Sequence, residues 1–260
     1  MEIRNLKDKT IIQSFLRRDP DIQYYCLGDL DDFFWPLTTW YAFVTGNVIN
    51  SICMLYKGSE IPTLLLFYSG DDPVPSLDLL KKIRSLLPDE FYAHLSKPLI
   101  STFNKEEIRE NYGLHYKMVM KELREDSADT HIQRLNLSNL DDIQKLYAAA
   151  YPSNWFNKRM LETGKYFGYF IDARLVGISG IHVYSPEYHV AALGNIAVDP
   201  DYRGKGIGYR LTVRLCNDLS RDTELIGLNV RNDNDNAIRC YLKAGFEITG
   251  EYDECLIRLR

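Results

Sequence analysis

The stretch from residue 194 to residue 219 constrains the fold of this chain more than any other. It reads as an apolar strand that ends at Asp199-Pro200, a loop with three glycines between residues 204 and 208, and then a helix. A glycine-rich turn between a strand and a helix points several backbone N–H groups at one spot, beside the partial positive charge of the helix N-terminus. Such a spot binds phosphate. The order of elements therefore predicts a phosphate site.

The residues of the loop and the helix suit this role. Glycine lets a ligand approach the backbone closely and adopts φ values that are costly for other residues. Arg203 and Lys205 add positive charge beside the loop. The helix is predicted to pack one apolar face on a sheet, because apolar residues recur at every fourth position. These residues are Ile207, Leu211, Leu215 and Leu219.

The motif Arg203-x-x-Gly206-x-Gly208 resembles the acyl-CoA pyrophosphate loop of the GNAT superfamily of N-acetyltransferases. A single motif of this kind is weak evidence. A second block follows after one helix and one strand, as in that superfamily, and the two blocks in this order make the resemblance specific. The second block consists of Asn234, Ala237, Ile238, Tyr241, Lys243, Gly245 and Phe246.

The resemblance implies an α/β fold of the α+β type, with a mostly antiparallel central sheet, a splayed pair of parallel strands and flanking helices. It implies acetyl-CoA, or another short acyl-CoA, as cofactor. The loop would take the pyrophosphate, and the strand before it would pair its backbone with the pantetheine arm. The residues expected to bind the cofactor are Ile196, Ala197, Val198, Arg203, Gly204, Lys205, Gly206, Ile207, Gly208, Asn234 and Tyr241.

Tyr241 is the expected catalytic residue, because the resemblance places a tyrosine here near the thioester sulfur. A phenol with an ordinary pKa of about 10 can donate a proton to the leaving thiolate at neutral pH. The alternative is that Tyr241 only packs against Phe246. Asn234 is expected to cap the helix that carries Tyr241. Cys240 is adjacent, but no histidine pairs with it in the sequence, so a structural role is favoured.

A general base is not evident in the sequence. Many members of the superfamily carry a glutamate early in the strand before the loop, and Ala192 occupies that position here. His182, Glu187 and His189 lie nearby in the sequence and could accept a proton directly or through water. Each is also compatible with a surface or core role. An amine that arrives neutral would need no strong base.

The first half of the chain shows the same order of elements without the glycine loop. Its corresponding segment, 70–75, has one glycine, two prolines and two carboxylates, which supply few N–H donors and repel phosphate. The chain is therefore interpreted as a tandem of two similar domains, 1–125 and 130–260, of which the first is a degenerate copy. Helices are expected at 5–18, 21–30, 76–87 and 104–112, and strands at 40–44, 48–56, 62–68, 91–95 and 114–123.

Composition limits the partners. The formal net charge is −5 and no run of Lys or Arg occurs, which argues against nucleic acid as the main partner. No apolar run approaches the ~20 residues of a membrane span, and the N-terminus lacks the apolar core of a signal peptide, so a cytoplasmic location is expected. The five cysteines are scattered, and His182 and His189 lack a third ligand, so no metal site is expected.

The expected function is acetyl-CoA-dependent transfer of an acetyl group to a primary amine by direct attack. The acceptor would be an amine-bearing small molecule or a peptide, and the protein a monomer that mimics a dimer, or a homodimer. The alternative is a non-catalytic acyl-CoA-binding sensor, which the missing carboxylate at Ala192 makes conceivable.

Overall fold

The computed structural model describes residues 2–68, 70 and 72–259. By their contacts, the residues form two compact units. Unit 1 contains residues 1–117 and 249–260, and unit 2 contains residues 118–248. The C-terminal segment is thus counted with unit 1, whereas the sequence-based boundaries assign it to the second domain. Domains that fold alone at 1–125 and 130–260 stay a prediction.

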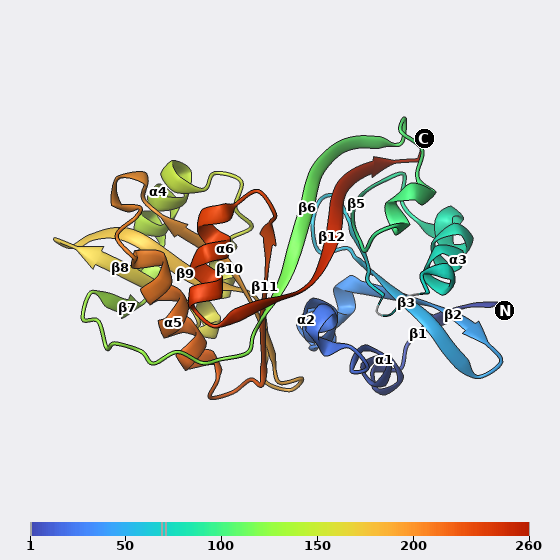
Figure 1. The fold of residues 1–260 in the computed structure, drawn as a ribbon, viewed down its shortest axis with the longest axis horizontal. Coiled ribbons are helices and arrows are strands. Elements are labelled where there is room, and N and C mark those ends of the chain that lie inside the picture. The colour runs from blue at the N-terminus through green and yellow to red at the C-terminus, as the bar shows by residue number, and fades with distance from the viewer. Residues whose placement is uncertain (1, 69, 71, 260) are drawn as a thin grey trace. The chain divides into compact units, whose positions relative to one another are not determined.

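Unit 1 is a twisted sheet with helices beside it (Figure 1). Its strands are β1 (Glu2–Leu6), β2 (Thr38–Thr45), β3 (Val48–Tyr56), β4 (Thr63–Leu66), β5 (Glu90–Leu95), the first part of β6 (Ile108–Met120) and the second part of β12 (Phe246–Arg258). Its helices are α1 (Lys9–Leu16), α2 (Pro20–Gly28) and α3 (Val74–Ile83), with 3₁₀ turns η1 (Trp35–Leu37), η2 (Arg84–Leu86) and η3 (Leu99–Thr102).

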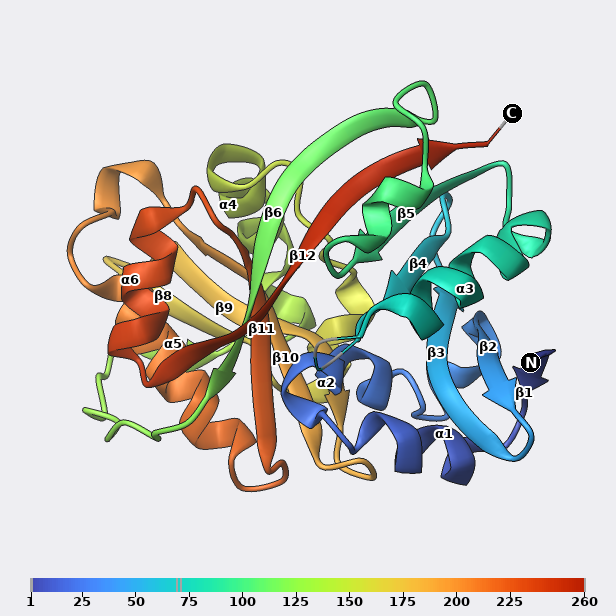
Figure 2. The same ribbon diagram turned by 45° about the vertical axis from the view of Figure 1, so that its right-hand side comes forward.

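The sheet of unit 1 is antiparallel except at one place. Strands β4 and β5 are parallel, and their register runs from Thr63 opposite Tyr92 to Leu66 opposite Leu95. On its other side, β5 pairs antiparallel with residues Asp253 to Arg258 of β12. Helix α3 packs on β2 and β3, as Figure 2 shows. A parallel pair within an otherwise antiparallel sheet, as predicted, therefore occurs here.

The helix expected at 104–112 is wrong. Asn104 begins a single turn, in which its N–H donates to the Glu107 carboxylate at 2.8 Å, and β6 then starts at Ile108. Glu107 also forms an ion pair with Arg84 at the end of α3. The sheet and this ion pair outweigh the helical spacing of the segment. Asp71 of the segment 70–75, and Ser69 before it, lie outside the described residues.

Unit 2 repeats the general layout, with an α-helix after its second parallel strand where unit 1 has a 3₁₀ turn. Its strands are β7 (Ile132–Arg134), β8 (Phe167–Ile171), β9 (Arg174–Ser185), β10 (Val190–Val198) and β11 (Leu225–Arg231), in the order β11-β10-β9-β8-β7. Its helices are α4 (Leu140–Ala150), α5 (Ile207–Leu219) and α6 (Asp235–Lys243), with 3₁₀ turns η4 (Leu137–Asn139), η5 (Lys158–Thr163) and η6 (Pro200–Tyr202).

The elements of unit 2 follow from local sequence signals. Strands β8 and β9 form a tight hairpin because Asp172 and Ala173 both take positive φ, 48° and 62°, as a type I′ turn requires. Helices α5 and α6 lie on one face of the sheet and α4 on the other (Figures 1 and 2). Strands β10 and β11 are parallel and the remaining pairs are antiparallel. The predicted fold class is confirmed.

Gly245 explains why the second sequence block ends in Gly-Phe. Its φ is 94°, and a Cβ placed on it would lie 1.9 Å from the backbone oxygen of Glu122. Its own carbonyl accepts hydrogen bonds from the N–H groups of Lys121 and Glu122, at 2.9 and 3.1 Å. Only glycine fits at this crossing of two backbone segments.

The charged segment 124–129 lies along α5. Asp129 Oδ2 is 3.0 Å from Arg210 Nε, and Asp126 forms an ion pair with Arg214. The side chain of Asn217 donates to the carbonyl of Arg124 at 2.8 Å. These contacts fix the path of the segment.

Among the helices of the described part of the chain, none is long and apolar enough to cross a membrane. A cytoplasmic location stays a prediction.

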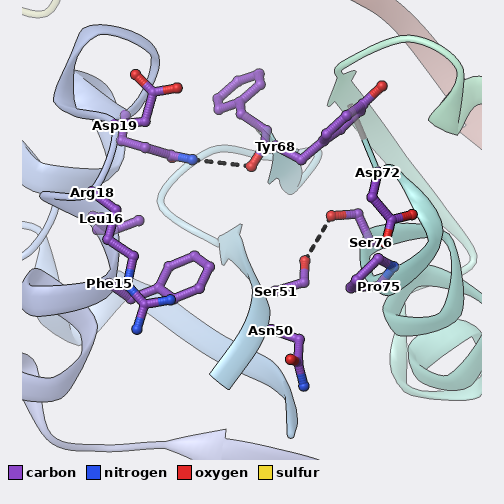
Figure 3. A pocket seen from close by; sticks show the side chains of 12 residues that line it. Phe15, Leu16, Arg18, Asp19, Asn50, Ser51, Tyr68, Asp72, Pro75 and Ser76 are labelled. Atoms are coloured by element: carbon purple, nitrogen blue, oxygen red, sulfur yellow. Dashed lines mark hydrogen bonds between the residues drawn. The ribbon is translucent and has the colours of Figure 1, made fainter. Parts of the chain in front are cut away.

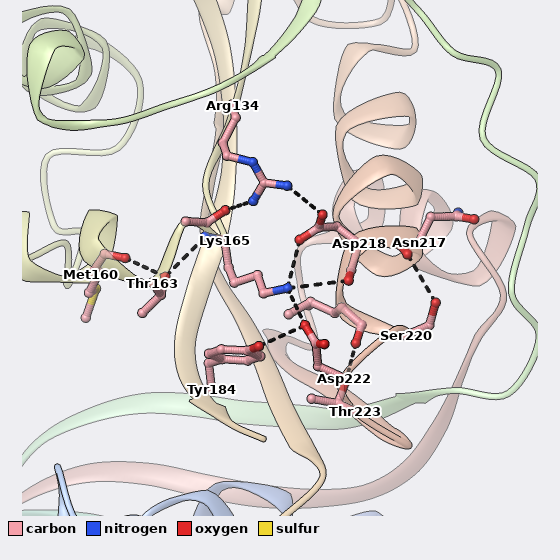
Figure 4. Close-up of polar contacts among 12 residues, drawn as sticks. Arg134, Met160, Thr163, Lys165, Tyr184, Asn217, Asp218, Ser220, Asp222 and Thr223 are labelled. Carbon is pink, nitrogen blue, oxygen red and sulfur yellow. Dashed lines mark hydrogen bonds and ion pairs between the residues drawn. The ribbon is translucent and has the colours of Figure 1, made fainter. Parts of the chain in front are cut away.

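A cluster of charged residues, of which Lys165 and Asp218 are buried, holds the C-terminal end of α5 (Figure 4). Lys165 Nζ lies 3.0 Å from Asp218 Oδ2 and 2.7 Å from Asp222 Oδ2. Arg134 binds the other oxygen of Asp218 at 2.7 Å, and the Tyr184 hydroxyl lies 2.9 Å from Asp222 Oδ2. Because α5 begins at the glycine loop, this cluster fixes the scaffold of the predicted phosphate site from about 20 Å away.

The cluster predicts how the stability of the protein depends on pH. Burial alone would raise the pKa of Asp218, but hydrogen bonds from Arg134 and Lys165 and their charges hold that pKa below its ordinary value. The stabilisation by the Asp218 carboxylate is therefore present above about pH 5 and is lost as the pH falls through the folded-state pKa. We expect Asp218→Asn to lower the free energy of unfolding by about 2 to 3 kcal/mol at pH 7.

Urea unfolding between pH 3.5 and 8, at about half-unit steps, measures this effect. The difference between the wild type and Asp218→Asn should shrink toward the acid end. Glu224→Gln, at an exposed position, is the matched control and should stay within about 0.5 kcal/mol of the wild type. A pH-independent difference for Asp218→Asn would show that the charge of Asp218 is not what stabilises the fold.

Candidate functional site

The glycine loop has the geometry that its sequence predicts. Gly204 and Gly206 both take φ of +76°, a region that side chains disfavour, and Gly206 is the N-cap of α5. No side chain caps this helix, so the first N–H groups of α5 face the loop without an intrahelical partner. The loop glycines are exposed. Several donors and the positive end of a thirteen-residue helix thus meet at an accessible place.

The two basic side chains of the loop brace it. Arg203 Nε donates to the carbonyl of Val198 at 3.1 Å, and its Nη2 donates to the carbonyl of Ala150, the last residue of α4, at 3.3 Å. Lys205 Nζ donates to the carbonyl of Asp201 at 3.1 Å and lies over the Tyr202 ring. Both side chains stay exposed, so their charges remain beside the nest of N–H groups.

Strand β10 leaves its parallel partner before it reaches the loop. Its pairing with β11 extends only from Val190–Leu225 to Leu193–Leu228, although β10 continues to Val198. A bulge follows, because Asn195 and Ile196 stand opposite the single residue Ser179 of β9. The strand edge at residues 196–198 is therefore available to hydrogen-bond an extended ligand. This is the strand that was expected to pair with a pantetheine arm.

Asn195 is the residue that joins the bulge to the other side of the site. It has φ of +54°, a conformation that Asn tolerates better than most residues, and it is 2% exposed. Its backbone carbonyl accepts from the Tyr147 hydroxyl at 2.7 Å. Its side chain accepts from the Trp155 N–H at 3.2 Å and donates to the Tyr166 hydroxyl at 3.0 Å. The segment after α4 is thus tied to the bulge.

This role of Asn195 and its partners was not predicted from the sequence. A Gly-Asn pair inside an apolar strand is a signal for a bulge, and Gly194-Asn195 is such a pair. The partners Tyr147 and Tyr166 read as ordinary apolar positions, since their hydroxyl contacts join residues that are 48 and 29 positions apart. No local pattern indicates these contacts.

The second predicted block lies in helix α6 and the residues next to its ends. Asn234 caps it as expected, since its side chain accepts from the Ala237 N–H at 3.2 Å. Tyr241 is partly buried, and its ring centroid lies 6.1 Å from that of Phe246. Burial raises the pKa of the Tyr241 hydroxyl, and the neighbouring Cys240 and Tyr151 raise it further. The phenol therefore holds its proton at neutral pH.

The environment of Cys240 disfavours the thiolate form. Burial raises the pKa of its thiol to about 11, although Lys243 opposes the shift. The thiolate, which is the reactive form, is therefore scarce at neutral pH. Gly208 is close by, and a Cβ on it would lie 3.9 Å from the Cys240 sulfur and 3.7 Å from Val198. Helices α5 and α6 thus approach each other at the loop.

The three candidate bases lie in different places. Glu187 and His189 are exposed in the turn before β10, and the length of that strand, about 26 Å, separates them from the loop. His182 lies beside the bulge, because a Cβ on Gly194 would be 2.3 Å from its ring. Burial lowers the pKa of His182, although a hydrogen bond with Asn195 opposes the shift. Its imidazole is therefore neutral at pH 7 and can accept a proton. Ala192 is fully buried.

Comparison with known proteins agrees with this geometry. The family model described as "Acetyltransferase (GNAT) family" matches residues 120–246. A Bacillus subtilis protein, named as a candidate [ribosomal protein bS18]-alanine N-acetyltransferase, is 30% identical over 129 residues, which cover 46% of this chain and 82% of that protein.

Solved structures resemble the chain over nearly its whole length. A GNAT-family acetyltransferase structure from Novosphingobium aromaticivorans has a TM-score of 0.63 at 19% identity and covers 92% of this chain and 97% of its own. A tandem GNAT protein from the clavulanic acid biosynthesis pathway has a TM-score of 0.56 at 12% identity and covers 100% and 98%. At these identities the likeness shows the fold alone, and it extends to the N-terminal half.

The side-chain hydrogen bonds of Asn195 predict an effect on stability that can be separated from the effect of its backbone conformation. Asn195→Gly keeps the positive φ but removes the bonds to Trp155 and Tyr166, whereas Asn195→Ala also strains the backbone. We expect Asn195→Gly to lower the free energy of unfolding by about 1 to 2 kcal/mol, and Asn195→Ala to lower it by about 1 kcal/mol more. Hydrogen exchange should be faster at residues 151–157 in both variants. Unchanged exchange there would mean that Asn195 does not hold this segment.

Proposed function

Because the chain belongs to the GNAT family of acetyltransferases, we propose that it transfers an acetyl group from acetyl-CoA to a primary amine. One observation supports this proposal above all. The strand edge at Ile196–Val198 and the N–H groups at the start of α5 are separated along the chain only by residues 199–206, which form a 3₁₀ turn and the glycine loop. An extended arm that ends in a pyrophosphate matches this combination of an open strand edge and an anion nest.

In the proposed reaction the amine attacks the thioester carbonyl directly in a ternary complex. The new C–N bond forms as the C–S bond breaks, and the leaving thiolate takes the proton of the Tyr241 hydroxyl. The proton that the amine loses passes to His182 or to water. Backbone N–H groups at the Asn195 bulge polarise the carbonyl oxygen. The remaining cofactor contacts are assigned to Arg203, Gly204, Lys205, Gly206, Ile207, Gly208 and Asn234.

The acceptor is proposed to be an amine on a small molecule or a peptide. The Bacillus relative is named for the alanine of a ribosomal protein, which makes a peptide N-terminus the first class to test. The segment between Tyr151 and Phe156, which Asn195 ties to the bulge, is the proposed wall of the acceptor side. A nucleic-acid acceptor is not proposed, because the chain carries net negative charge.

Unit 1 is proposed to lack a second cofactor loop. The N-cap of α3 is Pro73, and Asp72 Oδ1 accepts from the Val74 N–H at 3.0 Å. A carboxylate thus occupies the helix N-terminus at which unit 2 offers N–H groups to a phosphate, and it would repel one. We therefore expect one acyl-CoA per chain, whether the protein is a monomer or a homodimer.

Gly208 tests the cofactor site. A Cβ here meets only ordinary contacts, and alanine favours helix more than glycine, so Gly208→Ala should fold at least as stably as the wild type. Gly208→Glu places a negative side chain at the nest. We expect its Kd for acetyl-CoA, measured by calorimetry, to rise by about 10-fold or more, and that of Gly208→Gln to rise less. Equal affinity for all four proteins would place the pyrophosphate elsewhere.

Tyr241 tests catalysis. Tyr241→Phe keeps the ring against Phe246 but removes the acid, so kcat should fall by about 10² to 10⁴-fold while the Kd for acetyl-CoA stays within about twofold. The release of CoA thiol with a panel of amines and N-terminal peptides measures turnover. Tyr169→Phe is the control, since that hydroxyl contacts Arg210 at 3.1 Å, and it should retain kcat.

Two outcomes would contradict this assignment. Full turnover in Tyr241→Phe would show that another group protonates the thiolate. Acetyl-CoA binding without acetyl transfer to any amine of the panel would favour the alternative, a non-catalytic acyl-CoA sensor.

A further inference from the structure

Unit 1 contains a cavity of about 210 Å³ beyond the end of the first strand of its parallel pair (Figure 3). Phe67 and Tyr68, which follow β4, line it together with Pro75 and Ser76 at the start of α3. The remaining walls come from the end of α1, from α2 and from β3. Ligands of parallel sheets bind in the crevice beyond the carboxyl ends of the strands. Like the glycine loop of unit 2, the cavity lies between a parallel strand and the helix that follows it.

Gln23 of α2 brings an unmatched acceptor into the wall of this cavity. The residue is 5% exposed, and its amide nitrogen donates to the carbonyl of Phe67 at 3.0 Å, which fixes the orientation of the amide. The amide oxygen accepts no hydrogen bond from any described residue. It is not among the fully enclosed side-chain atoms that lack a partner, so a small molecule in the cavity can reach it. A ligand that donates a hydrogen bond here removes the cost of an unpaired buried oxygen.

A pair of serines adds an unmatched donor to the same cavity. The hydroxyl oxygens of Ser51 and Ser76 lie 2.8 Å apart, and the two residues are 3% and 2% exposed. Figure 3 shows the two side chains pointing toward each other. Two hydroxyl groups carry two hydrogens, and one hydrogen bond between them uses only one. Within the part of the chain that the structure describes, neither hydroxyl has a further partner, so the second hydrogen lacks an acceptor.

Charged side chains of both signs lie where the cavity meets the solvent. Arg18 is exposed, and its guanidinium lies over the Phe15 ring, 4.8 Å from the centroid. It donates one long hydrogen bond, of 3.4 Å, to a backbone carbonyl and forms no ion pair with a described residue. Asp72 is also exposed, and its carboxylate accepts from a backbone N–H but pairs with no cation among residues 2–68, 70 and 72–259. The wall thus offers one cation and one carboxylate that are not paired with each other.

These groups limit what can bind. A simple anion would pair with Arg18 but would also meet Asp72 and Asp19, the second acidic residue of the wall. A simple cation would meet Arg18, and an apolar molecule would leave the Gln23 oxygen and the serine hydrogen unmatched. A zwitterion whose ammonium and carboxylate groups are adjacent supplies a donor and an acceptor together. The volume lies below the range of drug-sized ligands, so the ligand has only a few heavy atoms.

We propose that unit 1 has a second ligand site, distinct from the acyl-CoA loop, which binds a small α-amino acid. The ammonium donates to the Gln23 amide oxygen, and the carboxylate accepts from the serine pair and from Arg18. Such charge-assisted hydrogen bonds are about twice as strong as neutral ones. The carboxylates of Asp19 and Asp72 balance the ammonium charge. This site does not depend on the proposed acetyl transfer.

Nuclear magnetic resonance of the full chain, uniformly labelled with ¹⁵N, tests the proposal without acyl-CoA. The side-chain amide signal of Gln23 is assigned by its loss in Gln23→Met, or in Gln23→Glu if the first variant does not fold. Glycine, L-alanine, L-serine and L-threonine are titrated separately. We expect at least one of them to shift the Gln23 signal in a saturable manner, with a Kd of about 1 mM or below.

Two analogues of the amino acid that binds test which of its groups are recognised. The N-acetyl derivative lacks the ammonium, and the carboxamide derivative lacks the carboxylate. Each should bind about 10-fold more weakly or worse, because a charge-assisted hydrogen bond is lost. Equal affinity for either analogue would overturn the proposed recognition of a zwitterion.

A pair of matched variants tests the position of the site. Arg18→Gln removes the unpaired cation of the cavity and should raise the Kd by about fivefold or more, whereas Arg109→Gln removes another exposed arginine of unit 1 and should leave it within about twofold. Equal affinity of these two variants would contradict the proposal, as would a Gln23 signal that none of the four amino acids shifts. Saturable shifts at the Trp155 indole N–H without any at Gln23 would also overturn it, because the amino acid would then bind at the proposed acceptor segment of unit 2.

Discussion

The functional part of unit 2 depends on the place where β10 stops pairing with β11. The ladder with β11 ends at Leu193 and Leu228, and β10 then bulges at Asn195 and continues toward the glycine loop paired only with β9. Backbone groups without a ladder partner must bond to something else. The interruption therefore leaves an open strand edge that leads to the glycine loop.

The bulge also explains how the two sides of the site are built differently. On the proposed cofactor side, each feature follows from neighbours in the sequence, such as the positive φ of Gly206 and the cap by Asn234. On the proposed acceptor side, Asn195 accepts hydrogen bonds from Tyr147 and Trp155 and donates one to Tyr166, and these partners come from distant parts of the chain. A change in the segment after α4 can thus reach strand β10 through one buried residue.

This difference decides what the sequence could predict. The glycine loop, helix α5 and the cap of α6 were predictable because short-range spacing determines them. The region 104–112 was predicted as a helix, and the structure shows a turn and a strand, because Glu107 pairs with Arg84 and the sheet recruits Ile108. The course of residues 124–129 along α5 depends on Arg210 and Arg214. Contacts across such distances in the chain leave no periodic signal in a single sequence.

Unit 1 contains a second parallel pair, and the end of that pair is built differently. Strands β4 and β5 pair over four residues and end together, so no unpaired stretch of strand leads from β4 to the helix that follows it. Pro73 and Asp72 stand where unit 2 has its anion nest. The fold thus provides the parallel pair twice, whereas the residues after the first strand of the pair decide whether a pyrophosphate would be attracted or repelled.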